Sequence, residues 1–404
     1  MGSYKFLMDL ALILMSTKLL GIITKRFNMP QVVGALLAGL LLGPAALNIL
    51  NETDFIMELS ELGVIVLMFT AGLDSDINKL KKTGKVSLTI AFMGVVIPLI
   101  GGFIVASIFN RPEVFVSNVE ASVFLQNIFV GVVLTATSVS ITVETLKEMG
   151  KLNTDVGNAI LGGAIIDDVL GILVLTVITS AMDKSVHIGF VFLKIFLFFV
   201  FSFVVGFIFF RLFKIITDYY QKDMRRFVIL AFVFCLLMAY CSEEFFGVAD
   251  ITGAYIAGLI LSNSKFSDYI LSRFEITSYV LLSPIFFASI GLKAVLPQMS
   301  SGVIFFSITL VIVAIITKII GCGISAKLFS FSNRESLQIG IGMVSRGEVA
   351  LIVASKGAAE GLMSSTLFGP IIIVVVVTTI VSPILLKLAY KKERKENTSQ
   401  QIFQ

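Results

Sequence analysis

The stretch Gly162–Gly171, GGAIIDDVLG, places two adjacent carboxylates, Asp167 and Asp168, in the middle of an apolar run. We predict a membrane-spanning helix over residues 155–181, because a helix needs about 20 apolar residues to cross the hydrocarbon core. A charge at the bilayer centre costs at least ~2.5–3.5 kcal/mol on insertion scales, so ionisable residues there are candidates for function. The pair therefore points to a membrane protein with a buried ionic site.

The composition of the whole chain also requires a bilayer. Hydrophobic residues make up 57% of the 404 residues and charged residues only 14%, whereas a soluble domain carries about 25% charged residues. Disorder is excluded, and the net charge of +4 is too small for a nucleic-acid-binding protein. One His and three Cys in apolar runs lack ligand-like spacing, so neither a zinc site nor a disulfide framework is expected. We expect no cofactor.

Polar residues, Pro and Gly divide the chain into about thirteen apolar segments. These runs are too long for barrel strands and do not alternate, so we predict an all-α polytopic membrane protein. Lys and Arg gather in the loops after odd-numbered segments and in the C-terminal tail. This bias predicts an N-terminus outside and a C-terminus in the cytoplasm. The predicted segments are 5–24, 30–47, 55–73, 84–108, 121–147, 155–181, 187–216, 224–242, 245–263, 273–291, 301–329, 335–358 and 364–390.

Two stretches of the sequence resemble each other. Residues 34–42 (GALLAGLLL) and 253–261 (GAYIAGLIL) are identical at six of nine positions. The same register aligns Thr70–Leu73 with Ser289–Leu292 in the segments that follow. Segments two and nine run in opposite directions, so we predict two inverted five-helix repeats, segments two to six and nine to thirteen. Inverted repeats are typical of secondary transporters with broken helices at the midplane; ancestral duplication without a transport role is the alternative.

Three further ionisable residues lie deep in apolar segments: Lys318, Arg346 and Glu348. With Asp167 and Asp168 their formal charges sum to −1. Structural ion pairs, Lys318 with one Asp and Arg346 with Glu348, would neutralise all but one carboxylate. A buried carboxylate without a partner is unfavourable, so it must take up a proton or hold a cation. That alternation is the chemistry of an exchanger.

Oxygen ligands for a hard cation are present in segment five. Residues 135–142 hold five hydroxyls in eight positions, and hard cations prefer oxygen ligands. Thr135, Thr137 and Ser138 are therefore candidates to support a broken helix, with Arg346 and Glu348 in the matching segment twelve. Hydroxyls that bond back to their own helix are the structural alternative. We expect Asp168, Asp167 and Thr137 to supply ligands for sodium.

These residues resemble those of a known family. Asp167-Asp168 with Lys318, TATS at 135–138 and SRGEVAL at 345–351 resemble the monovalent cation:proton antiporter superfamily, above all the NapA-type bacterial sodium/proton antiporters. The resemblance covers residues 5–390. It implies an NhaA/NapA-like fold of about thirteen transmembrane helices, with segments five and twelve as crossed broken helices, in a homodimer.

The resemblance also implies a division of the chain. The dimerisation domain would comprise residues 1–80 and 222–296, and the core transport domain residues 81–183 and 297–390. Residues 184–221 would form a linker helix and residues 391–404 a cytoplasmic tail without a nucleotide-binding domain. Segments one to three and eight to ten thus fall in the first domain.

The implied function is antiport of sodium, or lithium, for protons across the bacterial inner membrane, for pH and sodium homeostasis. The core would move as an elevator and carry Asp168, which binds the cation. Asp167 would pair with Lys318 and release it when sodium binds. Lys318 would then act as a proton carrier. Relatives with this Asp pair are expected to be electrogenic, exchanging two protons for one sodium.

Several other functions compete. A potassium/proton antiporter is the alternative within the same family. A cation channel would need filter rings, and a sodium-coupled symporter would need polar groups for an organic solute; neither is evident. An intramembrane aspartyl protease needs its two Asp on separate helices, whereas Asp167 and Asp168 are neighbours. We therefore expect a transporter and not an enzyme.

Overall fold

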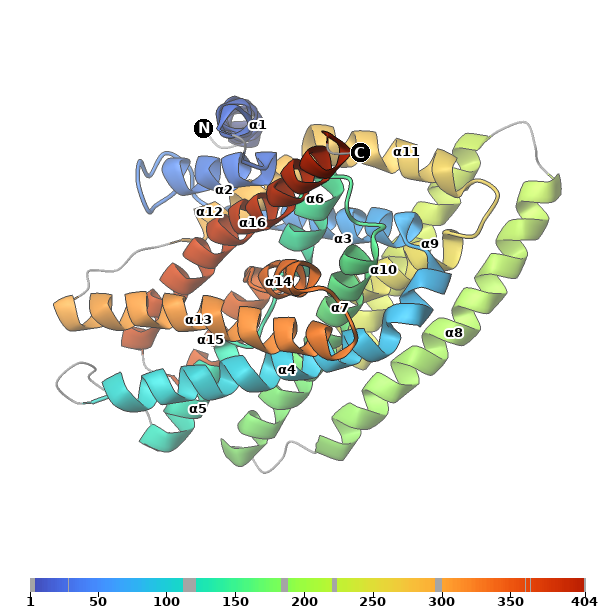
Figure 1. The fold of residues 1–404 in the computed structure, drawn as a ribbon. Helices are drawn as coiled ribbons and strands as arrows, with labels where there is room; N and C mark the ends of the chain where they lie inside the picture. The colour runs from blue at the N-terminus through green and yellow to red at the C-terminus, as the bar shows by residue number, and fades with distance from the viewer. Residues whose placement is uncertain are drawn as a thin grey trace.

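The chain folds into helices joined by loops. The computed structural model describes residues 4–27, 29–111, 121–182, 188–219, 224–294, 300–359, 361–363 and 365–402, and no strand occurs among them. The all-α prediction is therefore confirmed (Figure 1). In chain order the helices are α1 Lys5–Arg26, α2 Gln31–Leu42, α3 Asp54–Asp74, α4 Ile77–Phe109, α5 Val123–Val133, α6 Val139–Glu148, α7 Asp155–Met182, α8 Ile188–Tyr219, α9 Met224–Phe246, α10 Asp250–Leu261, α11 Ser267–Thr277, the π-helix η1 Ser278–Leu282, α12 Ser283–Leu292, α13 Ser301–Leu328, α14 Asn333–Gly342, α15 Glu348–Ala359 and α16 Ser365–Ile402.

Among the described residues, nine helical stretches are long and apolar enough to cross a membrane. Helices α2, α5 and α10 are also apolar but have only 12, 11 and 12 residues. Each predicted segment therefore contains one helix or consecutive helices, while the count of thirteen crossings stays a prediction. Several bounds differ: α4 begins at Ile77 rather than at residue 84, α2 ends at Leu42 rather than at residue 47, and α16 continues into the expected tail.

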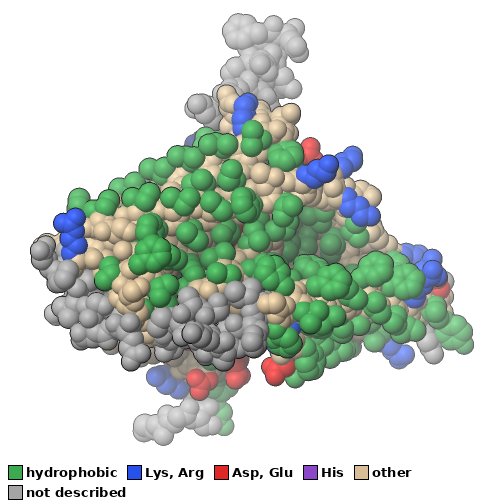
Figure 2. All heavy atoms as spheres, turned by 90° about the horizontal axis from the view of Figure 1, so that it is seen from below, with side chains coloured by type: hydrophobic (Ala, Val, Ile, Leu, Met, Phe, Trp, Pro, Cys, Tyr) green, Lys and Arg blue, Asp and Glu red, His purple; other side chains and the backbone are tan. Residues whose placement is uncertain are grey.

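The outer surface of the bundle is apolar. Figure 2 shows one face on which hydrophobic side chains form a broad band, with Lys, Arg, Asp and Glu gathered toward its rim. Helix α8, which lies along one side of the molecule (Figure 1), exposes large aromatic side chains such as Phe203, 77% exposed. Such a surface is stable in contact with lipid and not with water.

Two helix pairs pack through glycines. Helix α2 lies against α12, and α10 lies against α3, so closely that backbones touch. An added Cβ on Gly39 would meet the carbonyl of Ala288, and one on Gly258 would meet the carbonyl of Phe69. Small residues allow this close approach in membrane helices. The two pairs form a tightly packed unit.

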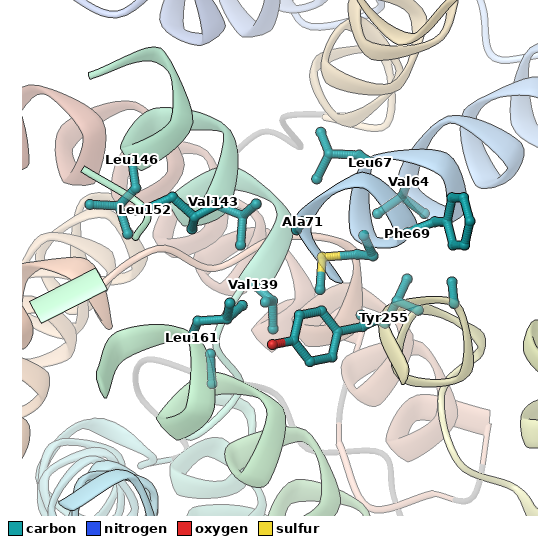
Figure 3. Packing of buried hydrophobic residues seen from close by; sticks show 14 of the residues in the cluster. Val64, Leu67, Phe69, Ala71, Val139, Val143, Leu146, Leu152, Leu161 and Tyr255 are labelled. Carbon is teal, nitrogen blue, oxygen red and sulfur yellow. The ribbon is translucent and has the colours of Figure 1, made fainter. Parts of the chain in front are cut away.

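The second unit is built around α4, α7 and α13. Helices α4 and α13 run side by side (Figure 1), and a Cβ on Gly321 of α13 would lie 2.8 Å from the carbonyl oxygen of Met93. Helix α6 joins this unit to α3 and α10. Figure 3 shows the buried apolar side chains at that junction, which are Val139, Val143 and Leu146 of α6, Val64, Leu67, Phe69 and Ala71 of α3, Tyr255 of α10, and Leu152 and Leu161 beside and within α7.

Candidate functional site

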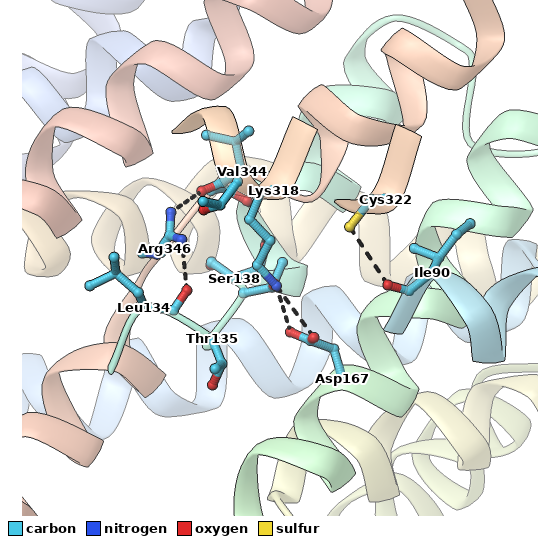
Figure 4. Close-up of polar contacts among 12 residues, drawn as sticks. Ile90, Leu134, Thr135, Ser138, Asp167, Lys318, Cys322, Val344 and Arg346 are labelled. Atoms are coloured by element: carbon cyan, nitrogen blue, oxygen red, sulfur yellow. Dashed lines mark hydrogen bonds and ion pairs between the residues drawn. The ribbon is translucent and has the colours of Figure 1, made fainter. Parts of the chain in front are cut away.

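The two adjacent carboxylates lie on α7 inside the bundle. Asp167 is 2% exposed and Asp168 is 7% exposed. Asp167 forms an ion pair with Lys318 of α13, whose Nζ lies 3.3 Å from both Oδ1 and Oδ2 (Figure 4). The expected pairing of Lys318 with one of the two Asp residues is therefore present.

Lys318 also connects the pair to an interrupted helix. Its side chain is 0% exposed, and Nζ donates a hydrogen bond of 2.6 Å to Oγ1 of Thr137. Thr137 lies between the end of α5 at Val133 and the start of α6 at Val139. A buried ammonium group needs such acceptors, because water is excluded. The structure thus brings Asp167, Lys318 and Thr137 into one polar cluster.

Both predicted helix breaks are present, and they lie against each other. The second separates α14, which ends at Gly342, from α15, which begins at Glu348. The N–H of Ser138 donates to the carbonyl of Ser345 at 2.7 Å, and the hydroxyl of Ser345 donates to the carbonyl of Ser138 at 2.9 Å. The two non-helical segments therefore satisfy part of each other's backbone, as irregular backbone inside a membrane protein must.

Arg346 donates to two carbonyl groups at the breaks and to one inside α13. Its guanidinium is 0% exposed and donates to the carbonyl oxygens of Leu134 at 2.7 Å, Val344 at 3.0 Å and Ala314 at 3.2 Å (Figure 4). Leu134 is the C-cap residue of α5, at an end where carbonyls lack partners and the helix dipole is negative. A cation there is doubly favourable.

Comparisons with known proteins identify the family of the chain. The family model "Sodium/hydrogen exchanger, transmembrane" matches residues 12–392. The chain belongs to the sodium/hydrogen exchanger family. It is 38% identical over 384 residues to the probable Na+/H+ antiporter GerT of Bacillus cereus, covering 95% of this chain and 98% of that protein. It is 37% identical to a Na+/H+ antiporter of Enterococcus hirae over 393 residues, 96% of this chain and 99% of that one.

Other relatives widen the range of cations and confirm the fold. The Na+/H+-K+ antiporter GerN of Bacillus cereus is 34% identical over 390 residues, covering 96% of this chain and 97% of GerN. The structure of the sodium proton antiporter MjNhaP1 from Methanocaldococcus jannaschii matches with a TM-score of 0.67 at 20% identity, over 94% of this chain and 95% of that one. The predicted superfamily is confirmed: this exchanger is a polytopic membrane transporter and not an enzyme.

One predicted site residue of this exchanger, Thr135, does not join the cluster. The hydroxyl of Thr135 donates back to the carbonyl of Val132 at 2.7 Å, as the structural alternative for these hydroxyls expected. The side chain of Glu348 lies outside the described part of the chain. An ion pair between Arg346 and Glu348 therefore stays a prediction, and the contacts described for the guanidinium are with carbonyls.

The sequence analysis missed the residues behind the ion pair. A Cβ on Gly94 of α4 would lie 3.5 Å from Nζ of Lys318 and 3.6 Å from Oδ1 of Asp167. The thiol of Cys322, one turn from Lys318, donates to the carbonyl of Ile90 at 3.6 Å. Nothing local distinguishes Gly94 from other glycines of an apolar helix. Only Cys322 could have been found from the sequence, because its spacing from Lys318 places both side chains on the same face of α13.

Proposed function

We propose that this exchanger moves sodium or lithium out of a bacterial cell in exchange for protons, at a site formed by Asp168, Asp167 and Thr137. The observation that carries the proposal is the buried Lys318–Asp167 ion pair directly beside a second buried carboxylate. Hard cations prefer oxygen ligands, and two carboxylates with one hydroxyl supply them. The relatives named Na+/H+ antiporters support sodium as the cation.

Competition between the cation and protons follows from charge. Two carboxylates and one ammonium leave one negative charge, which either a proton or sodium neutralises. When sodium approaches Asp167 it repels the ammonium of Lys318, whose acceptor Thr137 lies at 2.6 Å. We propose that Asp168 and Lys318 each release a proton at this step, so that two protons exchange for one sodium. Potassium in place of sodium is the second candidate, favoured by the likeness to GerN.

The elevator mechanism, too, is part of the proposal. Its basis is the two inverted repeats, for which the helix packing offers support: the glycine contacts come in equivalent pairs. Gly39 and Gly258 hold the same position in the two similar stretches, and the residues they meet, Ala288 and Phe69, are also equivalent. The α2–α12 and α10–α3 pairs would then be two copies of one arrangement.

Under this proposal the glycine-packed unit is the fixed part. It comprises residues 1–80 and 222–296, forms the homodimer, and leaves residues 81–183 and 297–390 to move, with 184–221 as the linker. The C-terminus lies in the cytoplasm, and the transporter serves pH and sodium homeostasis.

Everted membrane vesicles test the function. Adding sodium to vesicles with an imposed acid-inside pH gradient is expected to dissipate that gradient, and Asp168→Asn is expected to lower the rate at least 100-fold. The control is Asp155→Asn, an exposed carboxylate in the first turn of the same helix, which should retain the wild-type rate. Activity in Asp168→Asn would refute the assignment.

Two further assays test the cation selectivity and the number of protons exchanged. Repeating the vesicle assay with lithium and potassium decides which cations are exchanged. In proteoliposomes, an imposed membrane potential should change the exchange rate; an unchanged rate would exclude the exchange of two protons for one sodium.

A further inference from the structure

A pocket partly lined by polar side chains lies around Glu144 of α6. It has a volume of about 50 Å³ and lies between α1, α2, α6, η1 and α12. Its charged and polar lining comprises Thr17, Lys18, Gln31, Glu144, Tyr279 and Ser283. One wall is the π-helix η1, a geometry that is frequent at functional sites. The pocket therefore differs from the apolar helix contacts around it.

The two charges in this pocket have different surroundings. Lys18 is held at one wall, where its Nζ lies 3.4 Å from the ring centroid of Tyr279 and donates to the carbonyl of Tyr279 at 3.5 Å. The carboxylate of Glu144 has no hydrogen bond or ion pair with any described residue. It is partly buried and lines the pocket, so it is available to a cation there.

The neighbours of Glu144 on α6 are already engaged. Nζ of Lys147 lies 2.9 Å from a carboxylate oxygen of Glu275. One turn further, a carboxylate oxygen of Glu148 accepts a 2.7 Å hydrogen bond from the N–H of Gln31, at the N-terminus of α2. That helix start has Pro30 at its N-cap position and no side-chain cap of its own. Glu144 thus differs from Glu148, which has a structural role.

The position of Glu144 connects the pocket with the helix break. Helix α6 begins at Val139, directly after the break, and ends at Glu148. At 1.5 Å per residue, Glu144 lies about 9 Å along the helix from Ser138. The end of α6 is followed by Lys151, and Lys79 donates to the carbonyl of Asn153 nearby. By the positive-inside rule this end is the cytoplasmic one.

We propose that Glu144 is an access residue, a carboxylate that attracts the cation into this pocket from the cytoplasmic side on its way to Asp168. The proposal rests on the function proposed above. A carboxylate in a partly desolvated cavity raises the local concentration of cations. Lys18, in the wall of the same pocket, opposes this attraction, so the two residues have effects of opposite sign on cytoplasmic sodium.

Side-specific kinetics test the proposal. Sodium reaches the cytoplasmic face first in everted vesicles and the outer face first in right-side-out vesicles. Glu144→Gln is expected to raise the KM for sodium about fivefold in everted vesicles, with less than a twofold change in maximal rate and no change in right-side-out vesicles. Lys18→Gln should lower the KM on the cytoplasmic side, and Glu144→Asp should keep it within about twofold.

Glu148→Gln is the matched control, since it removes the same charge one turn away and keeps an acceptor for Gln31. Its KM is expected to stay within about twofold of wild type. An unchanged KM in Glu144→Gln, equal changes on both sides, or the same change in Glu148→Gln would each overturn the proposal. Should Glu144→Gln not insert, an unchanged or higher KM in Lys18→Gln overturns it. Absence of sodium exchange in the wild type would instead refute the proposed function.

Discussion

The two interrupted helices leave the same backbone groups without helical partners, but they satisfy them differently. The break at residues 134–138 supplies neutral hydroxyls, of which Thr137 binds Lys318. The break at residues 343–347 supplies a full charge, Arg346, which reaches across to the carbonyl of Leu134 in the first break. One break therefore contacts the buried ion pair, and the other stabilises the crossing of the two segments.

This difference assigns different roles to side chains that are equally buried. Within the described part of the chain Arg346 donates to backbone carbonyls, so its removal should act on the fold. Thr137 binds the ammonium of the ion pair, so its removal should act on exchange. The hydroxyls of Ser345 and Thr142 lie 2.7 Å apart between the breaks, and that of Ser345 also donates to the carbonyl of Ser138, so Ser345 contributes to the crossing with neutral groups.

The largest effect is expected for Arg346→Gln. Each buried carbonyl left without a donor costs about 1–3 kcal/mol, and the shorter amide cannot replace a guanidinium fork that serves three carbonyls. We expect a loss of about 3 kcal/mol or more, seen as a much lower thermal transition of the detergent-solubilised protein. The thermal transition of Arg346→Lys should lie between those of Arg346→Gln and the wild type, because an ammonium group keeps the charge but lacks the planar fork. A wild-type transition in Arg346→Gln would contradict the capping role.

A smaller but more specific effect is expected for Thr137→Val. This change keeps the shape of the side chain and removes the acceptor of Lys318. A hydrogen bond to a charged group contributes about 1.5–3 kcal/mol, so sodium exchange should fall about tenfold or more, and the thermal transition should fall less than in Arg346→Gln. The rate is measured in everted vesicles at saturating sodium.

Thr135→Val is the matched control for that experiment. The hydroxyl of Thr135 donates to the carbonyl of Val132, near the end of α5. Thr135 and Thr137 are both buried. We expect exchange within about twofold of wild type, since loss of such a bond affects only the local helix. Equal losses in both variants would show that Thr137 has no special role.

The sequence predicted the charged residues of the site better than the way the breaks are joined. Asp167, Asp168, Lys318 and Arg346 stand out because charge is rare in apolar segments, a signal that needs no partner. The acceptors of Arg346 are carbonyls of residues far apart in the chain, and carbonyls carry no sequence signal. For the same reason the sequence offered Glu348 as the partner of Arg346 and gave no indication of Leu134 or Ala314.

Helix positions were predicted better than helix ends. Hydrophobic runs overlap each described helix, but α11 begins at Ser267 rather than at residue 273, and α2 ends at Leu42, although apolar residues continue to residue 47. Its end coincides with Gly43-Pro44, where Gly43 has extended backbone with ψ −177°, because a residue directly before proline disfavours the helical conformation. This stop signal is present in the sequence, but hydropathy alone does not register it.

The smallest effect is expected for Ser345→Ala. Its hydroxyl donates to the carbonyl of Ser138 and contacts the hydroxyl of Thr142, both neutral groups. The backbone bond from Ser138 to the carbonyl of Ser345 remains, and Thr142 keeps the carbonyl of Gly342 as acceptor. A neutral hydrogen bond contributes about 1 kcal/mol, so we expect a slightly lower thermal transition and exchange within about threefold of wild type. A loss as large as that of Arg346→Gln would show that the hydroxyl, and not the guanidinium, holds the two breaks together.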